Sequence, residues 1–484
     1  MKKGFKDYLE KTGEVGYVTR VVHEVVEVAG LPGVNLSETV VFESGQLGQV
    51  SALENEAVEV LVLSKKIVKG GTKVARTGKK LEIGVGEELL GTMIDVLGRP
   101  LSGKAKHNER LVNYPVDVLP KGIGDRERIS RPLQTGIVLV DLLVPLGLGQ
   151  RELVMGDRKT GKSQLVMQTV MSQARKGSIC VFAAIGKRKT DIMKLQNFLK
   201  KEDIAQKTVV VAASAYDSAG EIWMTPYTAF TVAEYFRDRG EDVLVVLDDM
   251  STHAQFYREL SLLSRKFPGR DSYPGDIFSI HSRLLERAGN FKVGEREAAI
   301  TCLPIVESVM GDITGYISTN LMSMTDGHIF FDSDYFFRGR RPAINPFMSV
   351  TRVGHQTQTP LLRDIGQVLL ELMSNYEKTQ SFLKFGAELG ENSRQVLVMG
   401  NKLLDFFNQP PEAIMNLNVQ IILAGLLMAG LWDGTVTGKM VERYDQDAEF
   451  RKAADEMVTQ CRTLDFMISE LRKNPQFWLS EKPL

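Results

Sequence analysis

The chain contains 484 residues, which is too long for one hydrophobic core and corresponds to roughly three domains. With 43% hydrophobic and 25% charged residues, its composition is that of an ordinary globular protein, and this excludes fibrous and disordered classes. Lys plus Arg equals Asp plus Glu at 60 each. No overall basic field is therefore available to hold nucleic acid by charge, and we expect no nucleic-acid partner.

The sequence indicates neither secretion nor membrane insertion. Within the longest uncharged stretch, residues 413–432, the continuously apolar part covers only residues 421–432 and is too short to span a bilayer. The opening residues contain no apolar segment of the kind that marks a secretory signal. Cys180, Cys302 and Cys461 lie far apart in the sequence, which favours buried thiols in a reducing compartment. We therefore expect a soluble cytoplasmic protein.

The first 75 residues are rich in β-branched side chains and are divided by turn signals. Strands are predicted within residues 17–29 and over residues 39–43, 49–53 and 57–63. Short strands at this spacing predict a small barrel or sandwich. A helical alternative is disfavoured, because no stretch here keeps a 3.6-residue apolar period for three turns.

From about residue 150 the pattern changes to apolar runs that alternate with helical stretches. The runs cover residues 153–155, 179–185, 208–213, 243–247 and 298–303. Helices are predicted over residues 164–175 and 221–239. Strands that are buried on both faces and alternate with helices are typical of a parallel α/β sheet.

The strand pattern ends at about residue 359. Four helical segments are predicted after it, over residues 361–385, 393–408, 413–431 and 450–473. They are interrupted by glycines and by Pro410-Pro411. The third segment of the chain is therefore predicted to be an all-helical domain.

The sharpest motif is a phosphate-binding loop. Residues 156–163 fit the pattern G-x-x-x-x-G-K-[ST] and lie directly between a predicted strand and a predicted helix, the context that supports such a match. In such a loop the backbone N–H groups and the helix start attract the phosphates, the lysine reaches the β- and γ-phosphates, and the Ser hydroxyl takes a Mg²⁺ position. The candidate nucleotide-binding residues are Gly156, Asp157, Arg158, Lys159, Thr160, Gly161, Lys162 and Ser163.

A phosphate-binding loop that uses Mg²⁺ also needs a carboxylate at the end of another apolar strand. Asp248 follows the run Val243 to Leu247 and meets that requirement. We predict Asp248 as a metal partner that acts through water, because Mg²⁺ rarely loses its whole hydration shell. Ser163 and Asp248 are thus the two candidate metal-side residues.

Longer motifs resemble those of rotary ATPases. Residues 265–287 contain P-G-R-D-S-Y-P-G-D-I-F-S-I-H-S-R-L-L-E-R, which closely resembles the block P-G-R-x-x-Y-P-G-D-x-F-x-x-H-S-R-L-L-E-R of that family. Matching motifs also stand at residues 131–137, 149–153, 341–345 and 349–354. From about residue 15 to 430, the chain resembles the α subunits of F-type ATP synthases.

The resemblance implies three domains. They are an N-terminal β-barrel at residues 1–76, a central RecA-like P-loop α/β domain with a parallel sheet at residues 77–358, and a C-terminal α-helical domain at residues 359–484. It also implies binding of ATP or ADP with Mg²⁺. The implied partners are β-type catalytic subunits, which alternate with this chain in a hexameric ring, and a central γ-type shaft. The protein would then associate with a membrane only through the membrane-embedded sector, on its cytoplasmic or organelle-matrix face.

One residue distinguishes a catalytic from a non-catalytic chain in this family. Catalytic β subunits resemble G-E-R after the strand that follows the phosphate loop, and this chain reads Gly186-Lys187-Arg188. A protonated lysine cannot accept a proton or a hydrogen bond from water, and such assistance is typically worth about 10²–10⁴ in rate. The acidic loop of β subunits is also missing, since residues 386–392 read G-A-E-L-G-E-N. We therefore expect an α-type chain that binds nucleotide at a non-catalytic, regulatory site.

Arg352 matches the family arginine that reaches the nucleotide of the neighbouring β subunit. A guanidinium at the γ-phosphate stabilises transition-state charge and is worth about 10³–10⁵ in other phosphoryl-transfer systems. The resemblance therefore implies that Arg352 is an arginine finger.

Gln409, next to Pro410, resembles a family segment that lies near the adenine base of the nucleotide. For Gln409, a contact with the base and a plain role at the end of a helix are both open.

Several departures from the family leave alternatives open. Lys159 and Lys187 stand where α subunits usually have Gln, which fits either tighter triphosphate binding or lysines turned to solvent. About 14 residues precede the first expected strand, fewer than the family usually has, which puts the peripheral-stalk contact in doubt. An alternate or divergent complex, including one that only hydrolyses ATP, fits these departures.

The rival function is an autonomous hexameric ATPase, such as an RNA translocase or an export ATPase. The balanced charge of the first 75 residues and Lys187 both disfavour it.

Overall fold

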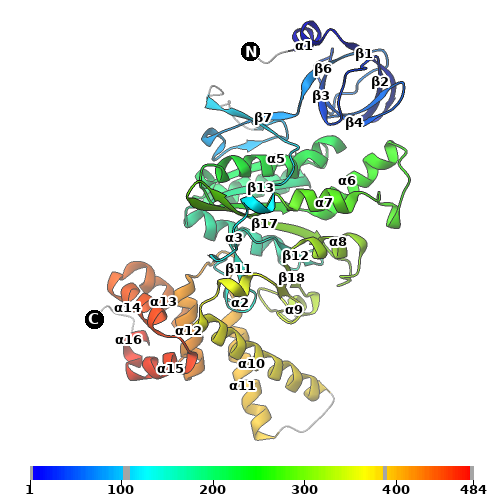
Figure 1. The fold of residues 1–484 in the computed structure, drawn as a ribbon. Coiled ribbons are helices and arrows are strands. Elements are labelled where there is room, and N and C mark those ends of the chain that lie inside the picture. Colours follow the sequence, from blue (N-terminus) through cyan, green and yellow to red (C-terminus); the bar gives the residue numbers. More distant parts are fainter. Residues whose placement is uncertain (1–3, 102–109, 385–389, 480–484) are drawn as a thin grey trace. The chain divides into compact units, whose positions relative to one another are not determined.

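The computed structural model describes residues 4–101, 110–384 and 390–479 (Figure 1). The chain divides into two compact units. The first comprises Met1–Glu127, Gly177–Glu307 and Thr314–Thr325, and the second comprises Arg128–Lys176, Ser308–Ile313 and Asp326–Leu484. Residues 77–358, the expected central domain, fall partly in each unit.

The first unit begins with a closed antiparallel barrel in the order β1-β2-β5-β4-β3-β6 (Figure 1). Its strands are β1 Val15–Val22, β2 Val25–Ala29, β3 Glu38–Phe42, β4 Leu47–Leu53, β5 Val58–Val62 and β6 Lys73–Lys80. The expected N-terminal β-domain is thereby confirmed as a barrel, and β6 continues beyond residue 76. A helix that the sequence pattern did not predict, α1 Phe5–Thr12, precedes β1 and is only about two turns long.

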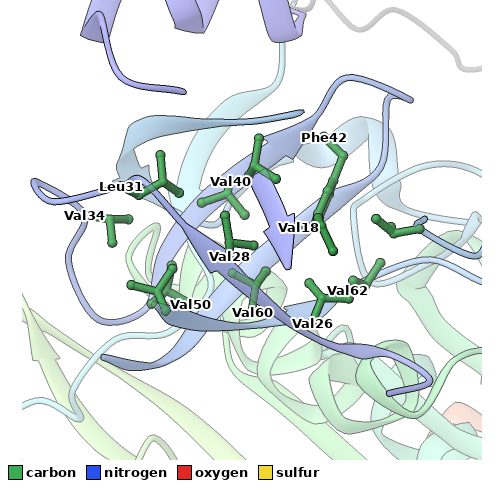
Figure 2. Packing of buried hydrophobic residues seen from close by; sticks show 13 residues of the cluster. Val18, Val26, Val28, Leu31, Val34, Val40, Phe42, Val50, Val60 and Val62 are labelled. Atoms are coloured by element: carbon green, nitrogen blue, oxygen red, sulfur yellow. The ribbon is translucent and has the colours of Figure 1, made fainter. Parts of the chain in front are cut away.

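Valine side chains fill the inside of the barrel. Figure 2 shows Val18, Val28, Val40, Phe42 and Val60 packed together, and all of them are buried. β-branched side chains suit this position, because they pack well on a pleated sheet and lose little rotamer freedom there. The β-branched richness that predicted strands is therefore also what forms the core.

A buried ion pair joins two neighbouring barrel strands. Arg76 on β6 donates Nε to Glu38 Oε1 and Nη2 to Glu38 Oε2, both at 3.0 Å. Glu38 also accepts hydrogen bonds from the backbone N–H groups of Gly78 and Asn35. Burial acts to raise the pKa of Glu38, but these hydrogen bonds outweigh it and hold the pKa below its usual value. Glu38 is thus a satisfied anion inside the barrel wall.

Beyond the barrel, the first unit contains a mostly parallel sheet in the order β17-β15-β13-β14-β8. The strand β16 pairs antiparallel with β17. Its strands are β8 Met93–Ile94, β13 Ile179–Lys187, β14 Thr208–Ser214, β15 Val243–Asp248, β16 Gly289–Val293 and β17 Arg296–Glu307. A separate pair consists of β7 Glu82–Val85 and β9 Val112–Pro115. The helices are α4 Lys189–Lys201, α5 Ala219–Arg237, α6 Met250–Leu263, α7 Ile277–Leu285 and α8 Tyr316–Met324. The expected parallel α/β organisation is confirmed, with one antiparallel addition.

The second unit contains a smaller strand ladder. β12 Glu152–Gly156 pairs in parallel with β18 Gly327–Phe331, and β18 pairs antiparallel with β19 Val350–Thr351. β10 Pro132–Leu133 and β11 Leu146–Gly147 form a separate antiparallel pair. The helices among these strands are α2 Val138–Leu143, α3 Lys162–Arg175 and α9 Ser333–Phe337.

The rest of the second unit is helical, as expected (Figure 1). The helices are α10 Pro360–Lys384, α11 Glu391–Phe407, α12 Leu417–Ala429, α13 Gly434–Gln446, α14 Ala448–Gln460, α15 Leu464–Lys473 and α16 Pro475–Leu479. The predicted helix over residues 450–473 is wrong in one respect, because Thr463 caps a new helix by accepting a hydrogen bond from Phe466 N–H. Among the described residues, no helix is long and apolar enough to cross a bilayer.

We expect Arg76→Ala to destabilise the barrel by about 3–5 kcal/mol, because it leaves Glu38 buried without its cation. Urea unfolding, followed by hydrogen exchange of barrel amides, measures this effect. Arg20→Ala is the matched control on the same barrel, since the Arg20–Glu27 pair is about one-third exposed on each side and such pairs are worth about 0–1 kcal/mol. Equal losses in the two variants would contradict the analysis.

The lowered pKa of Glu38 also predicts an acid dependence of barrel stability. The contribution of Glu38 is fully present above the pKa of an unfolded glutamate, about 4.3, and is lost as the pH falls through the lower folded-state pKa. The unfolding midpoint of the wild-type barrel is therefore expected to fall as the pH drops below about 4.3. The fall should be smaller in Glu38→Gln, which lacks the titrating group, and an unchanged acid profile in that variant would rule out Glu38 as the source.

Candidate functional site

The candidate phosphate loop connects β12 to α3, and two of its glycines are required by geometry. Gly156 has φ +149°, and a Cβ there would lie 2.6 Å from the carbonyl oxygen of Phe331. Gly161 has φ +109° and forms the N-terminal cap of α3. Both conformations are rare for residues with side chains. The strand, loop and helix expected from the motif are therefore present.

The lysine of the loop is held by the loop itself. Lys162 is buried, and its Nζ donates to the carbonyl oxygens of Gly156 at 2.7 Å and Asp157 at 2.5 Å. Thr160 Oγ1 also donates to the carbonyl oxygen of Asp157, at 2.7 Å. The side chains of Lys159 and Ser163 are exposed, as is that of Arg158. The loop thus has a fixed inner side and an accessible outer side.

Asp157 anchors this loop to two other segments of the second unit. Its carboxylate accepts hydrogen bonds from Ser308 Oγ and Ser333 Oγ, each at 2.7 Å, and from Gly311 N–H at 2.9 Å. Burial acts to raise the pKa of Asp157, but the three hydrogen bonds and the charge of Lys162 lower it overall. The sequence pattern gave no sign of this anchor, because the two serines lie about 150 residues or more away in the chain.

Lys187 occupies a charged cluster in the first unit. Its Nζ lies 2.6 Å from Asp248 Oδ1 and 3.0 Å from Asp249 Oδ2. Burial acts to lower the pKa of Lys187, but the two carboxylates raise it above its usual value, so Lys187 is held as a cation. Asp249 also caps α6 by accepting a hydrogen bond from Thr252 N–H at 2.7 Å. Of the two alternatives left open for Lys187, the one in which its side chain turns to solvent is disfavoured, since only 24% of the side chain is exposed.

Parallel strand pairing explains how this cluster arises. β13 and β15 pair with Ala184 opposite Asp248, so both strands end at the same edge of the sheet. Lys187 closes β13, and Asp248 closes β15. The motif comparison singled out each residue separately, and the strand register brings them together.

Arg352 follows β19 in the second unit, and its side chain is exposed. Its backbone N–H donates to the carbonyl oxygen of Asp326 at 3.0 Å. Arg151 pairs with the side chain of the same aspartate at 2.8 Å. The chain around Arg352 is therefore fixed by hydrogen bonds, while Arg352 itself is exposed and its charge acts to lower the pKa of the nearby Glu152.

A buried carboxyl group lies beneath this segment. Burial raises the pKa of Glu152 well above its usual value, although a hydrogen bond from Gln150 Nε2 at 2.7 Å acts in the opposite direction. Gln150 Nε2 also donates to Thr351 Oγ1 at 3.2 Å, and Thr351 Oγ1 in turn donates to the carbonyl oxygen of Pro145 at 2.8 Å. These contacts fix Thr351, the last residue of β19, directly before Arg352.

Gln409 is buried, and its amide is engaged by the backbone of the second unit. Oε1 accepts from Val138 N–H at 3.1 Å, and Nε2 donates to the carbonyl oxygens of Gly136 at 2.8 Å and Ala413 at 2.7 Å. Both amide protons and the carbonyl are thus used within the chain. This geometry favours the helix-end role over the base contact.

The available oxygen donors fit a divalent cation that arrives with a ligand. Within the described ranges, no group of three or more His, Cys, Asp or Glu side chains could hold a metal ion. A hydroxyl such as Ser163 and a carboxylate such as Asp248 are hard oxygen donors that suit Mg²⁺, which is usually held by one or two carboxylates plus substrate phosphates. Residues 386–392 were compared above with the acidic loop of β subunits, and residues 386–389 lie outside the described residues.

Comparison with known proteins gives matches to two domains of one family. The chain matches the nucleotide-binding domain of the ATP synthase alpha/beta family over residues 136–351 and the C-terminal domain of the ATP synthase alpha/beta chain over residues 358–473. It is 41% identical to ATP synthase subunit alpha of Caldanaerobacter subterraneus subsp. tengcongensis, covering 86% of this chain and 82% of that protein.

Two further relatives carry the same description. The chain is 38% identical to ATP synthase subunit alpha of Clostridium acetobutylicum, covering 87% of this chain and 83% of that protein. It is 37% identical to the same subunit of Neorickettsia sennetsu, covering 90% of this chain and 88% of that protein. Together with the two domain matches and the loop geometry, these identities show that the chain belongs to the ATP synthase alpha subunit family.

Proposed function

We propose that this chain is the non-catalytic, nucleotide-binding α subunit of an F-type ATP synthase or ion-translocating ATPase. The observation that carries the proposal is Lys187, whose ammonium is fixed by Asp248 and Asp249 where a catalytic chain would need a carboxylate. An ammonium has three N–H donors and no acceptor, so it cannot accept a hydrogen bond or a proton from an attacking water. Without that assistance, hydrolysis would be slower by about 10²–10⁴.

The proposed nucleotide site uses the loop from Gly156 to Ser163. Its backbone N–H groups and the start of α3 would attract the phosphates of ATP or ADP. Lys162 would exchange its two carbonyl partners for phosphate oxygens. Ser163 and Asp248 would be the metal-side residues, and bound Mg²⁺ would supply charge neutralisation of the phosphates. We assign Gln409 a positioning role, because its amide hydrogen bonds hold the segment after α11 against Gly136 and Val138.

The proposed partners follow from the exposed Arg352. Its guanidinium, directly after the short strand β19, would reach the nucleotide of a neighbouring β-type subunit in an alternating hexameric ring around a γ-type shaft. A planar guanidinium suits this task because it binds phosphate oxygens in a bidentate way. The protein would then act at the cytoplasmic or matrix face of the membrane through the other subunits.

The isolated chain should bind ATP and hydrolyse it poorly. We expect Lys162→Ala to weaken ATP binding by about 10- to 100-fold, because a hydrogen bond to a charged group is worth about 1.5–3 kcal/mol. Isothermal titration of the purified chain measures this change, and a phosphate-release assay measures turnover. Lys194→Ala is the control, since the side chain of Lys194 is 81% exposed on α4. Brisk multiple turnover by the lone wild-type chain would contradict the non-catalytic assignment and favour an autonomous ATPase.

We expect Arg352→Ala to lower ATP turnover of the assembled ring by about 10³–10⁵, because the charge on the transferring phosphoryl group would lose its guanidinium. Nucleotide binding to the isolated chain should stay at the wild-type level. Arg352→Lys should rescue only part of the turnover, since lysine keeps the charge and lacks the fork. Arg338→Ala, which removes another exposed arginine of the same unit, is the control. Loss of binding with unchanged turnover in Arg352→Ala would overturn this role.

A further inference from the structure

One side chain connects the candidate phosphate loop to an exposed turn of the second unit. The carboxylate of Asp157 accepts hydrogen bonds from Ser308 Oγ at 2.7 Å and from Gly311 N–H at 2.9 Å. The backbone adds a further connection, because Ser308 N–H donates to the carbonyl oxygen of Gly156 at 3.0 Å. The turn at residues 308–312 is therefore attached to the loop through both Ser308 and Gly311.

The turn needs support from outside, because its own backbone is strained. Met310 has φ +55°, a left-handed conformation that residues with side chains rarely adopt, and Gly311 follows with φ +72°. The side chains of Val309 and Met310 are 74% and 94% exposed, so packing contributes little to holding them. A strained conformation persists only where its surroundings determine it. The hydrogen bonds to Gly156 and Asp157 contribute to that determination.

The loop is fixed through the same two residues. The carbonyl oxygens of Gly156 and Asp157 accept hydrogen bonds from Lys162 Nζ, at 2.7 and 2.5 Å. Ser333 Oγ donates to Asp157 Oδ2 at 2.7 Å, which keeps the carboxylate aimed at the turn. The loop conformation that holds the lysine and the conformation of the turn are thus stabilised by shared groups.

We infer that Asp157 is a positioning residue that couples the nucleotide site to the turn at residues 308–312. Nucleotide bound at the loop stabilises the turn, and the anchored turn raises the affinity of the loop for nucleotide. The two effects are equal in free energy, because coupling between two sites is reciprocal. The inference rests on the proposed nucleotide site. It adds a route by which occupancy of that site reaches the surface of the chain, where Val309 and Met310 are displayed.

A purely electrostatic role for Asp157 makes the opposite prediction. A carboxylate close to bound phosphates repels them, so removing its charge would strengthen nucleotide binding. As an anchor, the same carboxylate strengthens binding by holding the loop in place beforehand, since ordering that is complete before binding is not a cost of binding. The direction of the change in Kd therefore separates the two roles.

The test is to measure the Kd of ATP for the full chain by isothermal titration in the presence of Mg²⁺. We expect Asp157→Ala to raise the Kd by about tenfold, which lies within the usual range of coupling between two sites. Asp157→Asn should raise it less, because the Asn amide can still accept from the turn and donate to the Ser333 hydroxyl. Val309→Ala shortens an exposed side chain of the same turn and should leave the Kd unchanged. An unchanged or lower Kd in Asp157→Ala, or an equal rise in Asp157→Asn, would overturn the inference.

A second readout responds to the coupling and not to a merely structural role. Hydrogen exchange of the amides of residues 308–312, followed by mass spectrometry, reports how often the turn opens. We expect ATP, at concentrations that saturate each protein, to slow this exchange by about tenfold in the wild type and far less in Asp157→Ala. Equal slowing by ATP in both proteins, or none in the wild type, would contradict the coupling.

A milder variant keeps the test decisive if Asp157→Ala folds poorly. Ser308→Ala removes one hydroxyl and leaves the backbone N–H of the same residue bonded to Gly156. It should raise the Kd and reduce the slowing of exchange in the same directions as Asp157→Ala, by smaller amounts. Wild-type values of both quantities in the folded Ser308→Ala variant would refute the role of the anchor.

Failure of the inference can be told apart from failure of the proposed function. If the wild-type chain binds no ATP, both the proposed function and the inference fall. If the wild-type chain binds ATP and Asp157→Ala binds it with the same Kd, only the inference falls.

Discussion

The contact between one ammonium and two carboxylates, Lys187 with Asp248 and Asp249, is the interaction on which the proposed non-catalytic role depends. Lys187 and Asp248 close two neighbouring parallel strands, and the pairing of Ala184 with Asp248 sets the register that brings them together. A lysine in this place supplies positive charge and no proton acceptor. The same interaction therefore supports the proposed non-catalytic assignment.

Much of the fold could be predicted from the sequence because its signals are local. β-branched runs indicated the barrel, and apolar runs with intervening helices indicated the parallel sheet. The phosphate loop was recognisable because Gly156, Gly161 and Lys162 occur at fixed spacing between a strand and a helix. These features depend on neighbours within about ten residues, the distance over which sequence periodicity is informative.

The features that could not be predicted depend on distant pairing. The antiparallel β16 was missed, since a parallel sheet gives no local signal for an added strand on β17. The contacts of Asp157 with Ser308 and Ser333 join segments about 150 residues or more apart in the chain. Lys187 was recognised as a departure, but its partners were unknown because they depend on strand register. Gln409 looked equally suited to two roles until its three amide contacts could be seen.

The ladder of β12, β18 and β19 has a mechanical consequence. β12 ends in Gly156 beside Phe331, at the end of β18, and β19 pairs with the beginning of β18 at Gly327, just before Arg352. The proposed phosphate loop and the proposed arginine finger thus lie at opposite ends of one short, hydrogen-bonded ladder. If the loop binds nucleotide and Arg352 meets a neighbouring subunit, as proposed, this ladder is a continuous hydrogen-bonded connection between the two sites.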